Sequence, residues 1–191
     1  MLLDAPAASL LVDEAVAAVS SAPETFFEVL DRLPAPIYVT DIDGTITYFN
    51  DACVALAGRM PECGRDKYCV TWKIYTSEGE LLPHDQCPMA VALREKRSIR
   101  NVEAIAERPD GTRINFAPFP TPYFDASGTM VGAVNLLLDI TPQRGPDYLR
   151  NQADKCRRLA RSVTDLPATE TLNLMAAKYD AQALKLARSS N

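Results

Sequence analysis

The chain has 191 residues, of which 47% are hydrophobic and 24% charged, and its formal net charge is −5. This length suits one ordinary domain with attachments, and the composition can bury a core, which argues against a disordered chain. The acidic balance argues against general nucleic-acid binding, because neutralising phosphates needs a basic surface. The charge is unevenly distributed, with −5 in residues 1–33, −4 in residues 34–141 and +4 in residues 142–191.

Cysteines and apolar runs bear on the compartment. The five cysteines are an odd number without the short repeated spacing of a disulfide framework. The apolar N-terminus has no basic leading segment, and Asp4, Asp13 and Glu14 interrupt it, so it does not match a signal peptide. No segment reaches the ~18 apolar residues that a membrane span requires. We therefore expect a cytoplasmic protein without a membrane partner.

The first half of the chain predicts helices followed by a hairpin. Residues 1–33 show helical periodicity in two runs, which Ser20–Pro23 separates. From residue 35, β-branched and aromatic runs flank Asp43-Gly44, a pair that favours a hairpin turn. Asn50-Asp51 then caps a short helix that Gly58 closes. Residues 59–82 predict irregular turns, with a hairpin-like turn at Glu78-Gly79.

The second half predicts one helix, three strands and a helical pair. Asp85 is the expected cap of the helix, with Pro88 in its first turn. Segments at 98–108, 113–124 and 129–138, the first with clear alternation and all separated by turn residues, predict a meander of three strands. Residues after Thr141 predict two amphipathic helices that form an αα-hairpin. The expected fold class is α+β, a five-stranded antiparallel sheet with short helices on one face. The hairpin is expected either to pack on the sheet or to form a seam with a dimer or partner.

Several strings occur in an order and spacing that resemble a PAS domain, a ligand-sensing module of bacterial signalling proteins. They are Leu33–Asp41 leading into Gly44, Ile46–Asn50, Glu103 with Arg108–Thr112, Gly128 with Val131–Val134, and Asp139-Ile140-Thr141. The resemblance covers residues 22–141. It divides the chain into an N-terminal helical flank (1–21), a PAS sensor domain (22–141) and a C-terminal helical hairpin (142–191).

The resemblance implies a sensor that binds a small ligand or a protein partner and transmits the change through its helical flanks, without an effector domain or enzymatic activity of its own. It also implies a homodimer, because PAS modules usually pair through such flanks. The elements expected to border the cavity supply the ligand-pocket candidates, which are Tyr38, Phe49, Cys53, Trp72, Tyr75, Met89, Phe116 and Asn135.

Cofactor alternatives depend on a few residues. His84 and Cys87 are the candidates for a haem-binding sensor, since Cys87-Pro88 resembles a thiolate ligand pair for haem iron, and Met89 lies beside them. A flavin photoreceptor would need an Asn-Cys-Arg-Phe motif, which the sequence does not contain. Cys63, Cys69, His84 and Cys87 are of the types that bind zinc but lack the two-residue spacing of a zinc knuckle, so we expect no metal site.

Two further alternatives belong to other classes. Asp41-Ile42-Asp43-Gly44-Thr45 resembles the opening motif of haloacid-dehalogenase-type phosphatases, in which the first Asp is the nucleophile and the second the general acid. Such enzymes also need a downstream acidic pair and a parallel sheet, and the predicted meander favours a hairpin turn instead. A DNA-associated regulator would use Arg157, Arg158 and Arg161, but a solvated helix face explains such a run equally simply.

Overall fold

A computed structural model of the chain describes residues 4–21 and 26–189. It divides into two compact units, residues 1–139 and 140–191. The expected boundary between residues 21 and 22 falls at a segment that lies outside the described residues. Among the helices of the described ranges, none combines the length and apolar character that crossing a membrane requires.

The first unit contains a seven-stranded antiparallel sheet in the order β2-β1-β7-β6-β5-β3-β4. Its strands are β1 (Ile37–Asp41), β2 (Ile46–Phe49), β3 (Lys73–Thr76), β4 (Leu81–Leu82), β5 (Ala104–Glu107), β6 (Arg113–Phe124) and β7 (Met130–Asp139). Its helices are α1 (Ala5–Ser21), α2 (Phe26–Arg32), α3 (Asp51–Ala57), the 3-10 turn η1 (His84–Gln86) and α4 (Pro88–Glu95).

The predicted number of five strands was wrong. The two additional strands, β3 and β4, form a hairpin around Glu78-Gly79, where the sequence indicated only a turn. Each of the two is short, and Gly79 adopts φ 92° in the turn between them. Four and two residues are too few for a period-two pattern to be recognised, and pairing with β5 is what extends β3 into the sheet.

Helices cover both faces of the sheet rather than one. The face that carries Tyr38 and Leu137, here called the inner face, packs against buried residues of α3 and α4. The opposite, outer face carries Val39 and Leu136, and α1 packs over β6 and β7 there. Because β7 is buried continuously from Gly132 to Leu138, both of its faces need such a cover. The helix expected to be the N-terminal flank thus lies within the first unit.

Local sequence explains the ends of the short helices. The side chain of Asn50 caps α3 by accepting from the Cys53 amide, and Gly58 ends the helix at φ 64°, as predicted. The expected cap Asp85 lies in η1 instead, and Cys87 precedes α4 without a side-chain cap bond. The helix therefore begins at Pro88, later than predicted, because residues 84–86 form a separate 3-10 turn.

Three prolines stand at alternate positions of β6, at 118, 120 and 122. Beyond Phe116, β6 pairs with β7 on one side only, because β5 pairs with residues 113–116. Alternate residues of a strand direct their backbone groups to the same edge. The three proline nitrogens, which lack a hydrogen, therefore face the unpaired edge, where no strand needs their N–H groups. The Pro120 carbonyl on that side accepts from the Ile99 amide at 3.2 Å, which covers the edge with the 99–100 segment.

The second unit contains α5 (Thr141–Arg144), α6 (Pro146–Ser162) and α7 (Leu166–Ser189). The last two form the predicted αα-hairpin. Their contact consists mainly of small buried side chains, those of Ala153, Cys156 and Ala176, with Tyr179 beside them. Small residues at the seam allow the two helices to approach closely.

Candidate functional site

The candidate site is the inner face of the sheet at its centre, where β1 and β7 lie side by side. Tyr38 of β1 pairs in register with Asn135 of β7. Side chains two residues apart on a strand share a face, so Thr40 lies beside Tyr38 on the same side. Tyr38, Thr40 and Asn135 are buried, which places three polar side chains in a mostly apolar core.

A chain of hydrogen bonds connects these strands. The Asn135 Nδ2 donates to the Tyr38 hydroxyl at 2.9 Å, and that hydroxyl donates to the Tyr68 carbonyl at 2.8 Å. The Asn135 Oδ1 accepts from the backbone amide of Phe119 in β6 at 2.9 Å. One buried network therefore joins β1, β6, β7 and the loop that carries Tyr68. Such networks fix one arrangement when satisfied and are costly to break.

Backbone geometry holds the Tyr68 carbonyl in place. Tyr68 adopts a left-handed conformation with φ 64°, and its amide donates to the Gly44 carbonyl at 2.7 Å. The Tyr68 ring packs against Gly44 so closely that a Cβ there would lie 2.2 Å from Cε1. A non-glycine residue at positive φ costs free energy, and the surrounding structure has to impose it. The turn between β1 and β2 is thus tied directly to the network.

Three thiols surround the Tyr38 hydroxyl end of the core. Cys53 Sγ lies 3.2 Å from the Ile37 carbonyl, Cys69 Sγ lies 3.1 Å from the Thr71 hydroxyl, and Cys87 Sγ lies 3.9 Å from the Tyr68 carbonyl. Burial raises the pKa of all three thiols, that of Cys87 to about 12. They therefore remain protonated at neutral pH and act as small, polarisable, largely apolar groups.

Burial is also the main reason why the pKa of Tyr38 lies well above its ordinary value, with the nearby thiols of Cys69 and Cys87 adding to the shift. The phenol is consequently a neutral donor and acceptor in the network. Thr40 provides a contrasting group, since its Oγ1 is buried without a hydrogen-bond partner among the residues that the structure describes. A buried, unpaired hydroxyl is a group that a ligand atom or a water molecule can satisfy.

A protein-family model described as the PAS fold matches residues 30–145. The chain belongs to this family. The PAS domain from the fruit-fly ELK potassium channel is similar in structure, with 18% sequence identity and a TM-score of 0.50 over 64% of this chain and 99% of that chain. Membership of the family points to a signal-sensing role.

Two other solved structures show weaker similarity. A LOV protein from Rhodobacter sphaeroides is 11% identical, with a TM-score of 0.47 over 92% of this chain and 98% of that chain. An RNA-binding light-oxygen-voltage receptor is 19% identical, with a TM-score of 0.48 over 64% of this chain, and the matched part is 34% of that receptor. A comparison with curated protein sequences gave no match.

The PAS core contains most of the predicted pocket residues. Tyr38, Cys53, Met89 and Phe116 are buried in its inner hydrophobic cluster, and Phe49 packs at the margin of that cluster. Asn135 is buried and hydrogen bonded to Tyr38. Their role in binding a ligand stays a prediction, but the fold brings them to one interior.

Two predicted pocket residues lie elsewhere. Trp72 is 45% exposed, and the Lys73 ammonium sits 4.1 Å from the centre of its ring. Tyr75 follows buried Ile74 on β3, so alternation turns it away from the inner cluster, and the Arg113 guanidinium lies over its ring at 4.4 Å. Before β3 was known, the sequence offered no register by which to assign these two aromatics to a face.

Sequence reasoning missed Thr40, Tyr68 and Cys69 as members of the site. Thr40 stands two residues after Tyr38 in an apparent strand, which was a usable signal. Tyr68 and Cys69 lie in the irregular segment, where no periodicity indicates an orientation.

Cys87 lies inside the apolar cluster, where burial raises its pKa and keeps it a thiol while no metal is bound, and its role as a haem ligand stays a prediction. His84 lies on η1, outside that cluster, and its pKa is lowered first by burial and then by the Arg59 charge. Cys63, one of the four residues considered for zinc, is exposed, whereas Cys69 and Cys87 are buried. Across residues 4–21 and 26–189, no group of three or more His, Cys, Asp or Glu side chains could hold a metal ion.

The phosphatase-like motif forms the turn of the β1–β2 hairpin. Asp41 Oδ1 accepts from the amides of Asp43 at 3.0 Å and Thr45 at 2.8 Å, and the Gly44 amide donates to the Asp41 carbonyl at 3.1 Å. The Asp41 carboxylate therefore stabilises the turn backbone. The strand pairs around it are antiparallel, unlike the parallel sheet that the phosphatase hypothesis requires.

Proposed function

We propose that this PAS protein senses a small ligand or a protein partner at the inner face of its sheet and passes the change through β7 to the α5–α7 helices. The observation that carries the proposal is the Tyr38–Asn135 network. Asn135 lies in β7, and a single residue, Ile140, separates the end of β7 from α5. A change in the network thus acts on the strand that continues into the C-terminal helices.

The unpaired Thr40 hydroxyl supports a ligand at this face, since a polar ligand atom there would gain a hydrogen bond and leave the Tyr38–Asn135 pair to respond. The neutral thiols near the Tyr38 phenol favour an uncharged, largely apolar molecule over an anion. Coupling to the helices requires the hydrogen-bond network to be arranged differently in the ligand-bound and the free state. A closely packed core favours two distinct arrangements over a continuous range of them.

Replacing Asn135 by Ala tests the coupling without knowledge of the ligand. Deleting the amide breaks the network at β7, and we expect hydrogen exchange of residues 141–162 to accelerate or slow relative to the native protein. Tyr48→Phe is the matched control, because the Tyr48 hydroxyl bonds exposed Asp31 outside the network. Altered exchange in β1 and β7 of the Asn135 variant with unchanged exchange in α5 and α6 would contradict the proposal.

The same hairpin offers a surface for homodimerisation. Tyr148 and Leu159 lie along one side of α6, and Met175 and Leu186 along one side of α7, by their spacing. On the opposite side of the hairpin Arg157 of α6 pairs with Asp180 of α7 at 2.7 Å. This ion pair shows that the charged sides of α6 and α7 lie on the same side of the hairpin. The apolar sides of both helices therefore lie together on the opposite side.

Leu159 is 45% exposed and Met175 41% exposed on this apolar side. We infer that a second copy of the chain covers it, because pairing of two such hairpins would bury both stripes. Leu159→Glu is expected to shift the protein toward monomer in sedimentation equilibrium. Leu174→Glu, on the outward side of α7, is the control. A native protein that is already monomeric, or two variants with equal effects, would argue against this interface.

A further inference from the structure

The charged side of the α6–α7 hairpin contains a cavity that the sensing role does not use. Its volume is about 210 Å³, and it is lined by Arg157, Ala160, Arg161, Thr169 and Asn173. The lining comes from both helices, because antiparallel packing brings the C-terminal turns of α6 beside the N-terminal turns of α7. Ala160 forms the floor, and its small side chain leaves the space open.

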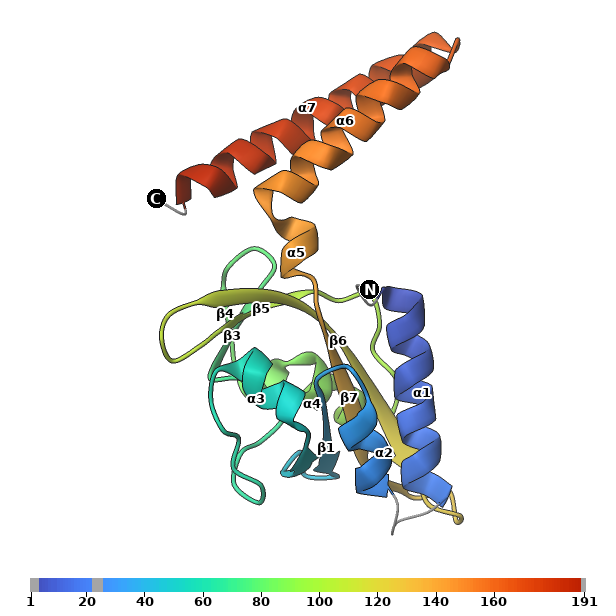
Figure 1. Cartoon of the computed structure of the whole chain (residues 1–191). Helices are drawn as coiled ribbons and strands as arrows, with labels where there is room; N and C mark the ends of the chain where they lie inside the picture. The colour runs from blue at the N-terminus through green and yellow to red at the C-terminus, as the bar shows by residue number, and fades with distance from the viewer. Residues whose placement is uncertain (1–3, 22–25, 190–191) are drawn as a thin grey trace. The chain divides into compact units, whose positions relative to one another are not determined.

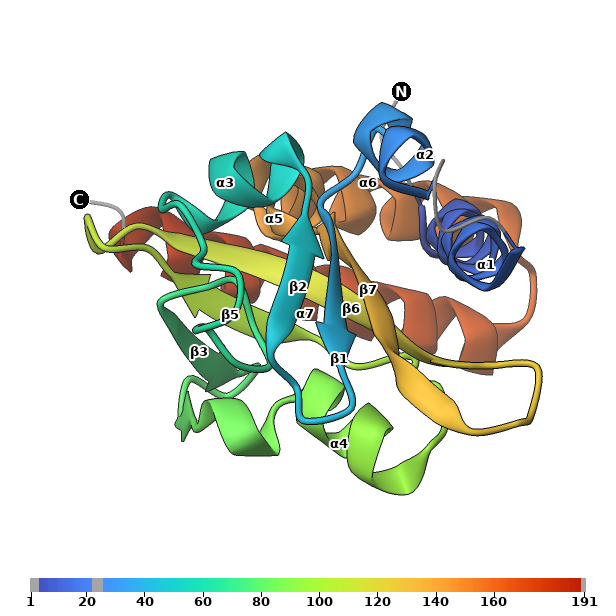
Figure 2. The same ribbon diagram turned by 90° about the horizontal axis from the view of Figure 1, so that it is seen from below.

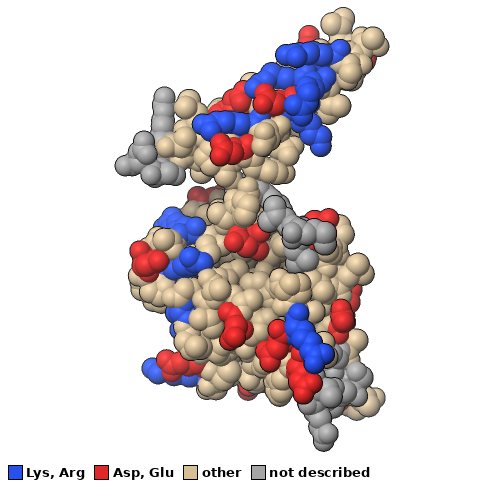
Figure 3. Space-filling model, viewed as in Figure 1, with Lys and Arg blue, Asp and Glu red and all other residues tan. Residues whose placement is uncertain are grey.

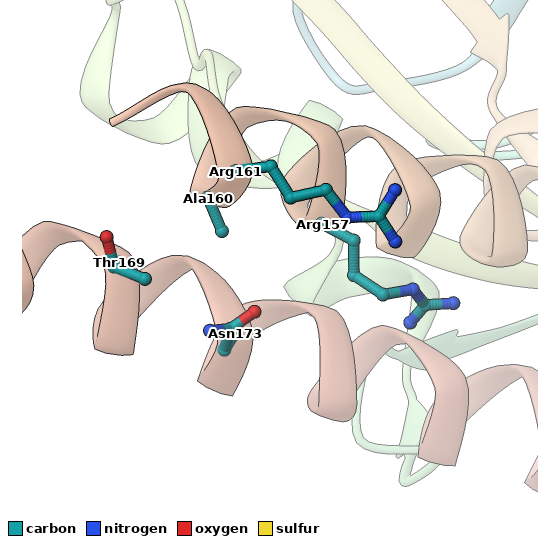
Figure 4. Close-up of a pocket in the computed structure, with 5 residues that line it drawn as sticks. All are labelled: Arg157, Ala160, Arg161, Thr169 and Asn173. Carbon is teal, nitrogen blue, oxygen red and sulfur yellow. The ribbon is translucent and has the colours of Figure 1, made fainter. Parts of the chain in front are cut away.

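The residues that line this cavity include no carboxylate, and Arg157, Arg161 and Asn173 carry N–H donors. Figure 4 shows the side chains of Arg157 and Arg161 extending in the same direction along α6, with Asn173 on the facing helix. Arg157 is already neutralised, since its Nη1 donates to Asp180 at 2.7 Å and its Nη2 to Asp154 at 3.0 Å. Arg161 has no ion pair or hydrogen bond to any residue that the structure describes.

The contrast between the two arginines determines the charge of the site. The carboxylates of Asp154 and Asp180 hold Arg157 in position and carry two negative charges against its one, so the charge of Arg161, which has no carboxylate partner of its own, brings these four groups to neutrality. The Thr169 hydroxyl donates to the Asp165 carbonyl at 2.9 Å, which leaves its oxygen as an acceptor and its position fixed. The Asn173 side-chain amide adds N–H donors from α7. A guanidinium and an amide on facing helices can bind the oxygens of one anion together.

We propose that this cavity is a binding site for the phosphate group of a small solute, which joins α6 to α7 through Arg161 and Asn173. The cavity is smaller than the ~300–1,000 Å³ typical of sites for larger organic ligands, so it suits one tetrahedral anion with any remaining part of the solute outside. Such an anion would connect the two helices at the end where they meet. The hairpin would then receive a chemical input separate from the sensor core.

Figure 3 shows that Lys and Arg gather over the hairpin with Asp and Glu among them. A general electrostatic attraction of anions to the hairpin is therefore the competing explanation for any phosphate binding. It predicts that every arginine of α6 contributes equally, whether or not it lines the cavity. Arg158 follows Arg157 directly but projects about 100° further around α6 and does not line the cavity. Arg158→Gln removes the same charge from the same helix, and is the matched control for Arg161→Gln.

The test is a titration of the full chain with inorganic phosphate and with a nucleoside monophosphate at constant ionic strength, followed by two-dimensional NMR of the Asn173 side-chain amide. We expect saturable shifts that sodium chloride does not produce, a loss of affinity of roughly tenfold or more in Arg161→Gln, and a change within about twofold in Arg158→Gln. Asn173→Ala should also weaken binding while leaving the backbone spectrum of the sensor unit unchanged.

The two titrants distinguish the source of the phosphate. Equal affinities identify the phosphate group alone as the feature recognised, and tighter binding of the nucleotide identifies an organic phosphate; both support the site. The site would be overturned if phosphate gave no saturable shifts or if chloride gave equal ones. It would also be overturned if Arg161→Gln and Arg158→Gln lost equal affinity for phosphate. These readouts are independent of the inner face of the sheet, so a failed sensor hypothesis leaves them interpretable.

Discussion

Tyr38→Phe removes one oxygen atom from the centre of the sheet and tests the energetic role of the network. The change leaves the Tyr68 carbonyl and the Asn135 Nδ2 without the partner that each has in the native protein. An unsatisfied buried polar group costs about 1–3 kcal/mol. Asn135 keeps its bond from Phe119, and the Cys87 thiol stays 3.9 Å from the Tyr68 carbonyl, so part of the loss is relieved.

We therefore expect Tyr38→Phe to lower the free energy of unfolding by about 2–4 kcal/mol. At roughly 2–4 °C per kcal/mol for a chain of this size, Tm should fall by about 5–15 °C. Stabilities of folded domains are about 5–15 kcal/mol, so the variant should remain folded at room temperature. The measurements are urea unfolding followed by circular dichroism and a thermal scan of the same samples.

Tyr48→Phe is the control, because its hydroxyl bonds an exposed carboxylate, and its loss should cost less than about 1 kcal/mol. A double-mutant cycle with Asn135→Leu isolates the Tyr38–Asn135 bond. Either single change breaks this bond, so the double variant should lose about 1 kcal/mol less than the sum of the single variants. Equal effects of Tyr38→Phe and Tyr48→Phe, or strictly additive changes in the cycle, would refute the energetic role of the network.

Three further predictions concern the same unit. Gly44→Ala should lower the free energy of unfolding by about 2–5 kcal/mol, because it combines positive φ with a Cβ that lies 2.2 Å from the Tyr68 ring. Gly79→Ala is also at positive φ but in open space, and should lower it by about 1–2 kcal/mol. Similar Tm values for the two variants would contradict this. Burial raises the pKa of Cys87 to about 12, so its contribution to stability is complete below the unfolded pKa of about 9 and decreases by about 1.4 kcal/mol per pH unit as pH rises toward 12. Urea unfolding from pH 8 to pH 11 should therefore show a shallower decline in Cys87→Ala, and parallel pH profiles would count against the burial argument. In the native protein a disulfide reagent should modify exposed Cys63 rapidly and buried Cys53 only at the rate of opening; equal rates would show that the core is open.

Local sequence was sufficient for elements whose ends depend on neighbouring residues. The Asp43-Gly44 turn, the Asn50 cap, the Gly58 terminus and the helical hairpin all formed as predicted, because turn and cap preferences act over a few residues. The limits of β6 agreed with the predicted 113–124 despite three prolines. The turn residues on either side indicated the strand there, and the one-sided pairing that makes the prolines tolerable was not visible in the sequence.

By itself, the sequence determined the family resemblance, the antiparallel class of the fold and most of the residues that line its core. Only the tertiary structure decided that Trp72 lies at the surface, that Tyr75 faces away from the inner cluster, and that Thr40 is left unpaired. The physical reason is that the direction of a side chain depends on strand register, and β3 acquires its register from β5, about thirty residues away. The structure likewise separates Arg157 from Arg161, because Asp180 of the facing helix and Asp154 of the same helix both pair with Arg157.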